Sequence, residues 1–313
     1  MTVMTDISQI DRKAWKQLIA TSPVASWFQT PEAYDFFASV PASVKPFVVA
    51  VEDKQLQGVI VGYTVAEGGP VKRFFSKRTI IQGGPLLAKD ISDEALTALL
   101  NAVPRNGIYS EMRNFSDYSA YKHVFAQAGW TYKPHYDVYM ATTAGWRDKL
   151  QDAKRRQVNK ALKEGYTWHE ANQEHEVRQW YGILKQLYRN KVHRPLFDYD
   201  FFRQAWQQGV CKVLIVNDGY GNITGGALVP VMNQTAYEWY VCGSVMATYA
   251  LQEWCEQNGI TRLDAVGAGE PNKEYGVRDF KLRMAGELHE FGRFIRIQAK
   301  NRYNLGVWVI NLL

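Results

Sequence analysis

The chain has 313 residues, of which 46% are hydrophobic and 13% aromatic, and it carries 37 Lys/Arg against 31 Asp/Glu. This length and apolar content suffice for two ordinary domains and exclude a disordered chain. Three cysteines without metal or redox spacing favour a reducing compartment over a disulfide framework, and no apolar run approaches the roughly 20 residues that span a bilayer. We therefore expect a cytoplasmic protein, one that works at most at the inner face of the membrane.

The first half of the chain predicts a strand pair followed by a helix. Residues 48–51 and 57–63 are apolar segments joined by the turn at residues 52–54. Further along, Leu96, Leu99, Leu100 and Val103 follow the i, i+3, i+4, i+7 spacing of an amphipathic helix. This half carries 14 Lys/Arg against 13 Asp/Glu within residues 1–143 and is nearly neutral.

The second half opens with a strongly basic segment. Residues 147–163 contain seven basic residues and only two acidic ones, Asp148 and Asp152. A solvated helix face needs acidic partners four residues away, and Asp152–Arg156 is the one such pair. The segment is therefore either a solvated helix face or a surface for phosphate groups, from a nucleotide-sugar pyrophosphate, a lipid pyrophosphate or tRNA.

The pattern of the first half then repeats. Residues 212–216 and 223–232 predict a second strand pair across the turn at residues 218–221, and apolar spacing predicts helices around residues 177–188 and 247–254. Alternating helices and strands with hairpins inside each half indicate an α/β (α+β) architecture of two tandem domains. We place these domains at residues 1–143 and 144–313, each with a mixed, mainly antiparallel sheet flanked by helices.

The segment 264–288 carries the most specific pattern. Gly267 and Gly269 follow an apolar strand, where the chain must bend or approach another group closely. Tyr275, Arg278, Phe280 and Lys281 then gather on a short segment that we expect to be helical, before a strand that starts near Gly286. A loop with a packed Phe and a solvated Lys would give the same local pattern.

This order resembles the C-terminal signature of the FemABX-type peptidoglycan aminoacyltransferases. That family has a Gly-x-Gly strand end, a Gly-x-x-x-Phe-Lys segment and a closing Gly-Glu-Leu, which here are Gly267/Gly269, residues 276–281 and residues 286–288. The resemblance extends over nearly the whole chain and implies two GNAT-like domains, with the active site in the second. It also departs from some members, because no coiled-coil arm is present and the connection from Gly243 to Val245 is short.

The resemblance implies transfer of an aminoacyl group from aminoacyl-tRNA to an amine of a peptidoglycan-precursor stem peptide, with a lipid-linked or nucleotide-linked precursor. Such a reaction requires neither a metal nor a bound cofactor. No Gly-x-Ser-x-Gly elbow and no triad spacing occurs in the sequence. Direct attack by a positioned amine requires no protein nucleophile, only alignment, a proton acceptor and a cation or N–H donors for the oxyanion.

Four residues are the catalytic candidates. In the resemblance the pair Phe280-Lys281 lies at the active site, and Lys281 is the candidate cation; a solvated lysine is the alternative. Glu238 is the first candidate for the base, because it lies in an apolar strand at residues 235–242, facing the same side as Tyr240, and burial raises a carboxyl pKa. Asp264 is its competitor, and either carboxylate could instead pair with Arg262 or Arg278.

Ten further residues are the candidates for binding substrate. They are basic residues of the 147–163 segment and of the region before Pro195, aromatic residues of predicted helices and strands, and the glycines of the C-terminal signature: Arg155, Arg156, Lys160, Tyr188, Arg194, Tyr240, Gly267, Gly269, Tyr275 and Arg278.

Two other functions stay open. A CoA-dependent N-acyltransferase on the same fold would use acyl-CoA as donor, but residues 240–247 contain one glycine and lack the Arg/Gln-x-x-Gly-x-Gly/Ala pattern that lets backbone N–H groups cradle a pyrophosphate. A non-catalytic module that binds cell-wall precursors would keep the basic segment without requiring Lys281. Finally, the apolar face of residues 304–313 either packs on the second domain or contacts an anionic bilayer transiently.

Overall fold

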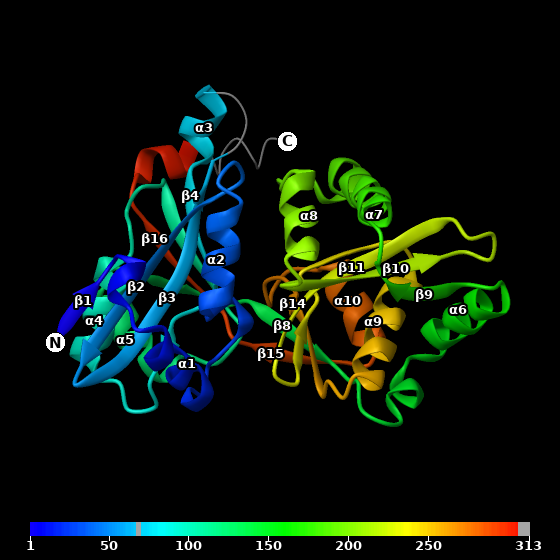
Figure 1. The fold of residues 1–313 in the computed structure, drawn as a ribbon, viewed down its shortest axis with the longest axis horizontal. Helices are drawn as coiled ribbons and strands as arrows, with labels where there is room; N and C mark the ends of the chain where they lie inside the picture. Colours follow the sequence, from blue (N-terminus) through cyan, green and yellow to red (C-terminus); the bar gives the residue numbers. More distant parts are fainter. Residues whose placement is uncertain (67–69, 306–313) are drawn as a thin grey trace. The chain divides into compact units, whose positions relative to one another are not determined.

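The computed structural model describes residues 1–66 and 70–305 and divides the chain into two units. Unit 1 comprises Met1–Pro134 and Phe291–Leu313, and unit 2 comprises His135–Glu290. Each unit is built on one mixed sheet with helices packed against it (Figure 1). The predicted architecture of two α/β domains with mainly antiparallel sheets is confirmed.

The elements of unit 1 lie in both terminal parts of the chain. Its strands are β1 (Thr2–Met4), β2 (Lys45–Asp53), β3 (Gln55–Val65), β4 (Arg78–Gly83), β5 (Leu86–Leu87), β6 (Tyr109–Asn114), β7 (Thr131–Lys133) and β16 (Arg293–Ile297). Its helices are α1 (Arg12–Thr21), α2 (Pro31–Ser39), α3 (Pro70–Ser76), α4 (Asp93–Ala102) and α5 (Lys122–Gln127).

Unit 2 is one continuous segment. Its strands are β8 (Tyr136–Met140), β9 (Thr167–Glu170), β10 (Cys211–Asn217), β11 (Ile223–Met232), β12 (Thr235–Tyr237), β13 (Tyr240–Cys242), β14 (Arg262–Gly267) and β15 (Gly286–Glu290). Its helices are α6 (Asp152–Lys163), α7 (Glu174–Leu187), α8 (Tyr199–Gln207), α9 (Val245–Gln257) and α10 (Gly276–Arg283), and a π-helical turn, Tyr188–Val192, follows α7.

The two sheets have the same strand order. It runs β1-β2-β3-β4-β6-β16-β7 in unit 1 and β9-β10-β11-β12-β14-β8-β15 in unit 2. The fourth and fifth strands are parallel in both sheets, as β4 with β6 and β12 with β14, and the other neighbours along each path are antiparallel. The repeat that the sequence predicts is therefore a duplication of the whole sheet.

The sixth strand of the unit 1 sheet comes from the part of the chain that follows unit 2, whereas the sixth strand of the unit 2 sheet is the first strand of that unit. β16 follows β15 in the chain but pairs with β6 and β7, and β8 follows β7 but pairs with β14 and β15. The predicted division at residues 1–143 and 144–313 differs from this arrangement, because β8 belongs to unit 2 and β16 to unit 1. The alternation of apolar residues in either strand suits both sheets, so local sequence does not reveal which sheet each strand joins.

Local physical chemistry accounts for most of the predicted elements. The strand pairs β2–β3 and β10–β11 are formed, and Asp218 closes the second turn by accepting hydrogen bonds from the backbone N–H groups of Tyr220 and Asn222. The helices predicted from apolar spacing are α4, α7 and α9, and Ser92 caps α4 by accepting from the Ala95 N–H.

The basic segment is divided between two elements. α6 begins at Asp152, whereas Arg147 lies in the 3-10 turn Trp146–Lys149. Arg147 forms ion pairs with Glu253, at 2.7 Å, and with Glu256 on α9, and its guanidinium lies 4.6 Å from the ring of Trp146. Arg147 therefore belongs to a structural network and does not contribute to a free basic surface.

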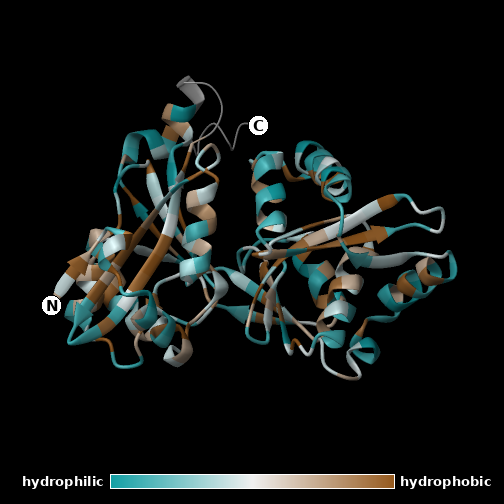
Figure 2. Ribbon diagram, in the orientation of Figure 1, coloured by the Kyte–Doolittle hydropathy of each residue, from teal (hydrophilic) through white to brown (hydrophobic). Residues whose placement is uncertain are grey.

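Each unit has its own core, and hydrophobic residues concentrate along the central strands (Figure 2). In unit 1, Val49, Val51 and Ile60 pack with the apolar face of α4. In unit 2, Leu214 and Ala227 pack with α9. The longest described helix, α7, has 14 residues, and none of the described helices is long and apolar enough to cross a membrane.

Strand β16 provides a test of this fold. Phe294 is 1% exposed and stacks on Phe125 with the ring centroids 3.7 Å apart. Phe294→Ala should lower the free energy of unfolding by about 3–5 kcal/mol, because it leaves a cavity in the core of unit 1. Denaturant titration measures this change. Ile297→Ala on the same strand, where the side chain is 44% exposed, is the control and should change it by less than about 1 kcal/mol.

Candidate functional site

The parallel strands β12 and β14 of the unit 2 sheet separate at Glu238. β12 pairs with β14 as far as Tyr237 and Asp264, and the Glu238 N–H donates to the Asp264 carbonyl at 2.8 Å. The chain then continues as β13, which pairs with β11 instead. The predicted continuous strand at residues 235–242 is thus broken at Glu238 and Trp239, and one edge of β13 has no strand partner in the described part of the chain.

β14 also departs from regular geometry just past this point. Val266 has a φ of 52°, a left-handed conformation that is unfavourable for a β-branched residue. The Asp264 carboxylate accepts from the Val266 N–H at 2.8 Å and so helps to hold this bend. Carbonyl groups alternate sides along a regular strand, whereas the bend turns three consecutive carbonyls toward one point.

Lys281 of α10 occupies that point. Its Nζ lies 2.5, 3.1 and 3.0 Å from the carbonyl oxygens of Ala265, Val266 and Gly267. The residue is only 6% exposed, so it is not the solvated lysine that the sequence left open. An ammonium group has three N–H donors, and here each has a backbone acceptor.

Three buried carboxyl groups lie within electrostatic reach of this ammonium. They are Asp137 of β8, Glu238 and Asp264, and each is at most 3% exposed. Burial raises the pKa of Glu238 to about 7, which the charge of Lys281 and a hydrogen bond from Thr248 only partly offset. Burial and then the Asp137 carboxyl raise the pKa of Asp264 well above its ordinary value. Since one ammonium cannot neutralise three carboxylates, the cluster retains protons at neutral pH.

Glu238 differs from the other carboxyl groups in one atom. Its Oε2 is buried and has no hydrogen-bond partner among the described residues. Neither Arg262 nor Arg278 forms the ion pair that the sequence left open. The Arg262 guanidinium lies 5.0 Å from the ring of Tyr139, and Arg278 donates to the carbonyls of Glu270 and Lys273.

The glycine signature forms the loop between β14 and α10. Gly269 has a φ of 82°, and a Cβ there would lie 2.9 Å from the ring of Tyr275, so glycine is required. Arg278 holds the same loop through its two carbonyl contacts. The structure therefore brings Gly267, Gly269, Tyr275 and Arg278 together next to Lys281, where they shape the loop.

Phe280 is half-buried and packs against the unit 2 core, with the ammonium of Lys154 lying 4.7 Å from its ring. Its neighbour Lys281 faces the carboxyl cluster instead. Phe280 therefore fixes α10 through packing, and its predicted catalytic role stays untested.

Tyr188 and Tyr240 belong to an aromatic cluster beneath α7 and α8. Their ring centroids are 6.2 Å apart, and Tyr240 contacts Phe202 at 4.9 Å. Trp239, next to Glu238, packs edge-on against Phe201 of α8. This cluster links the strand break to both helices.

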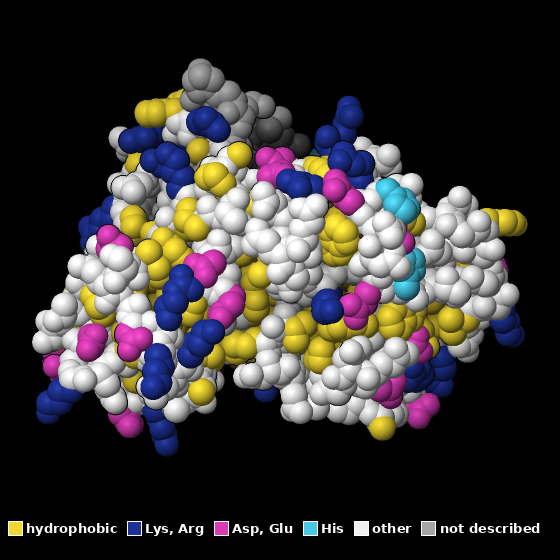
Figure 3. Space-filling model, in the orientation of Figure 1, with side chains coloured by type: hydrophobic (Ala, Val, Ile, Leu, Met, Phe, Trp, Pro, Cys, Tyr) yellow, Lys and Arg dark blue, Asp and Glu magenta, His cyan; other side chains and the backbone are white. Residues whose placement is uncertain are grey.

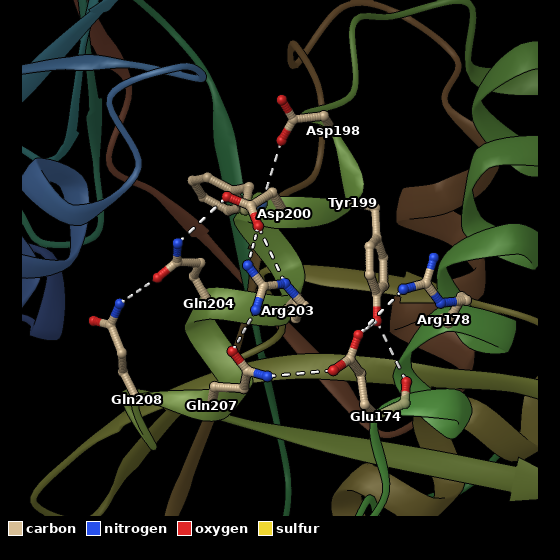
Figure 4. A network of polar contacts seen from close by, with 10 residues as sticks. Glu174, Arg178, Asp198, Tyr199, Asp200, Arg203, Gln204, Gln207 and Gln208 are labelled. Carbon is tan, nitrogen blue, oxygen red and sulfur yellow. Dashed lines mark hydrogen bonds and ion pairs between the residues drawn. The ribbon is translucent and has the colours of Figure 1, made fainter.

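A polar network fixes α8 against the start of α7 (Figure 4). The Glu174 carboxylate accepts from Tyr199, Arg178 and Gln207 at 3.2, 3.2 and 3.4 Å. The Arg178 guanidinium also stacks 4.3 Å from the Tyr199 ring. Arg194 lies exposed in the connection between these helices.

The predicted phosphate-binding residues lie apart from the carboxyl cluster, on α6. Arg155 donates to the carbonyls of Asp148 and Leu150, so it supports the preceding turn. Arg156 and Lys160 are exposed and line a surface hollow with Asn159, Lys163 and Glu164.

Sequence reasoning does not find Asp137 or Thr248 as members of the site. Asp137 has a usable signal, since it is a carboxylate within an apolar strand, as Glu238 and Asp264 are. The predicted domain division hides it, because that division puts β8 in the first domain. Thr248 lies within a predicted amphipathic helix, and no local sequence pattern distinguishes it as a site residue.

Unit 1 has the corresponding strand break, between β4 and β5, but there the side chains of Gln29 and Tyr118 fill the space at the break. The Gln29 amide donates to the carbonyls of Gly83 and Gly84, both at 3.1 Å. The Tyr118 hydroxyl lies 2.9 Å from the Gly83 carbonyl oxygen and 2.8 Å from that of Pro85. The strand break of unit 1 is therefore occupied by packed side chains. Among the described residues, no group of three or more His, Cys, Asp or Glu is arranged to hold a metal ion.

Comparison with solved structures identifies the fold. The structure of FemX aligns with a TM-score of 0.69 at 14% identity, covering 97% of this chain and 99% of that one. This chain has the FemX-like tandem GNAT fold. L-PGS from Bacillus licheniformis aligns at 0.59 and 12% identity (95% and 96% covered), and a tandem GNAT protein from the clavulanic acid biosynthesis pathway at 0.57 and 12% (95% and 98%). No family model and no curated protein matches the sequence.

The three hydrogen bonds from Lys281 to backbone carbonyls predict a measurable contribution to stability. Lys281→Met should lower the free energy of unfolding by about 3 kcal/mol or more at neutral pH, because three carbonyls and the carboxyl cluster lose their buried cation. Arg283→Met, at an exposed position of the same helix, should change it by less than about 1 kcal/mol. Equal stability of the two variants would show that Lys281 is solvated in solution.

Proposed function

We propose that this protein is an N-acyltransferase whose reaction centre is the strand break of unit 2. The observation that carries this proposal is the unpartnered Oε2 of Glu238, held in a buried cluster where parallel strands part. The fold of FemX and of tandem GNAT proteins supports the reaction class. The filled break of unit 1 supports unit 2 as the active unit.

Glu238 acts as the proton acceptor. The acceptor amine attacks the donor carbonyl, a C–N bond forms, and the bond from the carbonyl carbon to the leaving oxygen or sulfur breaks. The amine loses a proton to Glu238, which passes it to the leaving group. A carboxyl group with a pKa of about 7 suits this exchange, because both of its forms are populated near neutral pH.

Lys281 acts as a positioning residue. Its three donors hold the β14 carbonyls, so its charge, rather than a direct hydrogen bond, stabilises ionised Glu238. The edge of β13 that faces away from β11 has no strand partner in the described part of the chain, and its backbone groups can receive an extended donor chain as an added strand. These backbone groups replace Lys281 as candidates for contact with the donor carbonyl.

The donor in this proposal is aminoacyl-tRNA, and the acceptor is the stem-peptide amine of a peptidoglycan precursor. The start of α9 favours this donor over acyl-CoA. The Met246 N–H already donates to the Ser244 side chain at 3.2 Å, and the Ala247 N–H to the Ser244 carbonyl at 3.1 Å. Two first-turn donors that would bind a pyrophosphate are therefore occupied.

The base is tested by Glu238→Gln. The parent enzyme should gain kcat/KM with rising pH through about 7, as Glu238 ionises, and the variant should lose this limb together with roughly 100-fold or more of the rate. The pH profile of labelled aminoacyl transfer measures both effects. A variant that keeps the parental rate and limb would exclude Glu238.

Asp264→Asn is the matched control. An asparagine keeps the oxygen that accepts from the Val266 N–H, and Asp264 already shares its environment with Asp137. This variant should retain the pH limb near 7. Loss of the limb in Asp264→Asn, with retention in Glu238→Gln, would make Asp264 the base.

The donor is tested by comparing labelled aminoacyl-tRNA with labelled acyl-CoA. Reversing the charge of Arg156 and Lys160 should weaken tRNA binding and lower its log–log salt slope by about one for each phosphate that the variant no longer binds. Lys13→Glu with Lys89→Glu, two exposed positions in unit 1, makes the same charge change and should leave the slope unaltered. Transfer from acyl-CoA alone would establish the CoA-dependent reaction.

A further inference from the structure

One end of unit 1 gathers exposed apolar side chains. α3 and the helical residues 300–305 lie side by side there (Figure 1). Phe74, Phe75, Ile297 and Leu305 are 56%, 46%, 44% and 46% exposed and account for four of the ten exposed large hydrophobic residues in the described chain. The two Phe rings form an edge-to-face pair with centroids 5.2 Å apart.

Backbone and side-chain contacts join four chain segments into this surface. The Ile108 N–H donates to the Lys77 carbonyl at 2.7 Å, and the Ile108 carbonyl accepts from the N–H groups of Gln298 and Ala299. The Arg302 guanidinium lies 4.5 Å from the ring of Phe74. Lys45 and Lys77 line one hollow together with Pro104 and Asn106. We call the surface made by residues 43–47, 73–78, 104–107 and 297–305 the unit 1 patch.

The charge of the unit 1 patch is entirely positive. Its segments contain no Asp or Glu and seven basic residues: Lys45, Arg73, Lys77, Arg78, Arg105, Lys300 and Arg302. Five of the seven are exposed, and Lys77 and Arg78 are half-buried. Basic and hydrophobic side chains are visible together at this end of the unit in Figure 3.

We propose that the unit 1 patch docks on an anionic lipid bilayer. Cations attract anionic headgroups while apolar side chains enter the boundary between headgroups and acyl chains, and neither attraction alone anchors a protein firmly. This inference is independent of the proposed reaction. Of the C-terminal segment 304–313 that the sequence suggested for bilayer contact, residues 306–313 lie outside the described residues, and the proposal rests on the patch alone.

The apolar part of the patch favours a bilayer over RNA. Bases stack on open aromatic faces, whereas the Arg302 guanidinium lies over the Phe74 ring and the Phe74 and Phe75 rings pack edge-to-face on each other. Ile297 and Leu305 gain free energy in hydrocarbon and offer no face for stacking. A surface that binds nucleic acid would also leave the exposure of four large apolar side chains unexplained.

Vesicle flotation of the full chain tests the proposal. The protein should float with vesicles of equimolar phosphatidylcholine and phosphatidylglycerol, and far less with phosphatidylcholine alone. The double variant Phe74→Ser/Phe75→Ser should bind the anionic vesicles at least about tenfold more weakly. Phe74→Leu/Phe75→Leu should retain binding, since it keeps apolar side chains at the same positions.

Arg73→Gln and Lys300→Gln should each weaken binding by about fivefold.

Matched controls lie in unit 2. Tyr220→Ser and Val277→Ser remove exposed hydrophobic side chains, 93% and 45% exposed, and Arg156→Gln/Lys160→Gln removes two exposed charges. These variants should float as the parent does, and all variants should melt within a few degrees of it. Failure of the parent to float with anionic vesicles overturns the proposal. Equally weakened flotation of the controls overturns it as well, as does loss of RNA binding with unchanged flotation in the serine variant.

Discussion

The geometry of the unit 2 site depends on how one buried ammonium group is satisfied. A regular strand directs successive carbonyls to opposite sides, so three consecutive carbonyls converge only because Val266 adopts a left-handed conformation that costs about 1–3 kcal/mol. The three hydrogen bonds of Lys281 and the Asp264 bond to the Val266 N–H offset this cost. Every Lys281 donor is used within the protein, whereas Glu238 Oε2 in the same cluster has no hydrogen-bond partner among the described residues. The roles that we propose for Glu238 and Lys281 follow from this arrangement.

The return of the chain to unit 1 at β16 constrains the chain as a whole. Two short links, residues 134–135 and residues 291–292, join the units, and the sheet of unit 1 obtains its sixth strand, β16, only through the second link. A single cut between the units therefore cannot leave both sheets intact. β15, which follows the site helix α10, is joined directly to a strand whose Phe294 stacks in the core of unit 1.

Features with a local cause could be predicted from the sequence. Apolar spacing predicted α4, α7 and α9, and the Gly267 to Lys281 pattern predicted a strand end followed by a short helix. The break at Glu238 could not be predicted, because apolar and polar residues continue through residues 235–242 as in one strand. The break exists because β12 pairs with both β11 and β14, whereas β13 pairs with β11 and separates from β14, and this pairing is determined by tertiary contacts. The burial of Lys281 and the partners of Arg147 on α9 also depend on contacts distant in sequence.

The two copies of the fold have diverged at the same structural position. In unit 1, the neutral side chains of Gln29 and Tyr118 form hydrogen bonds with the carbonyls of the strand break. In unit 2, an ammonium and three carboxyl groups occupy the corresponding region, and they cannot all be charged at once. A break whose carbonyls are bonded by neutral groups stabilises the fold, whereas a break that retains a proton near neutral pH is suited to chemistry.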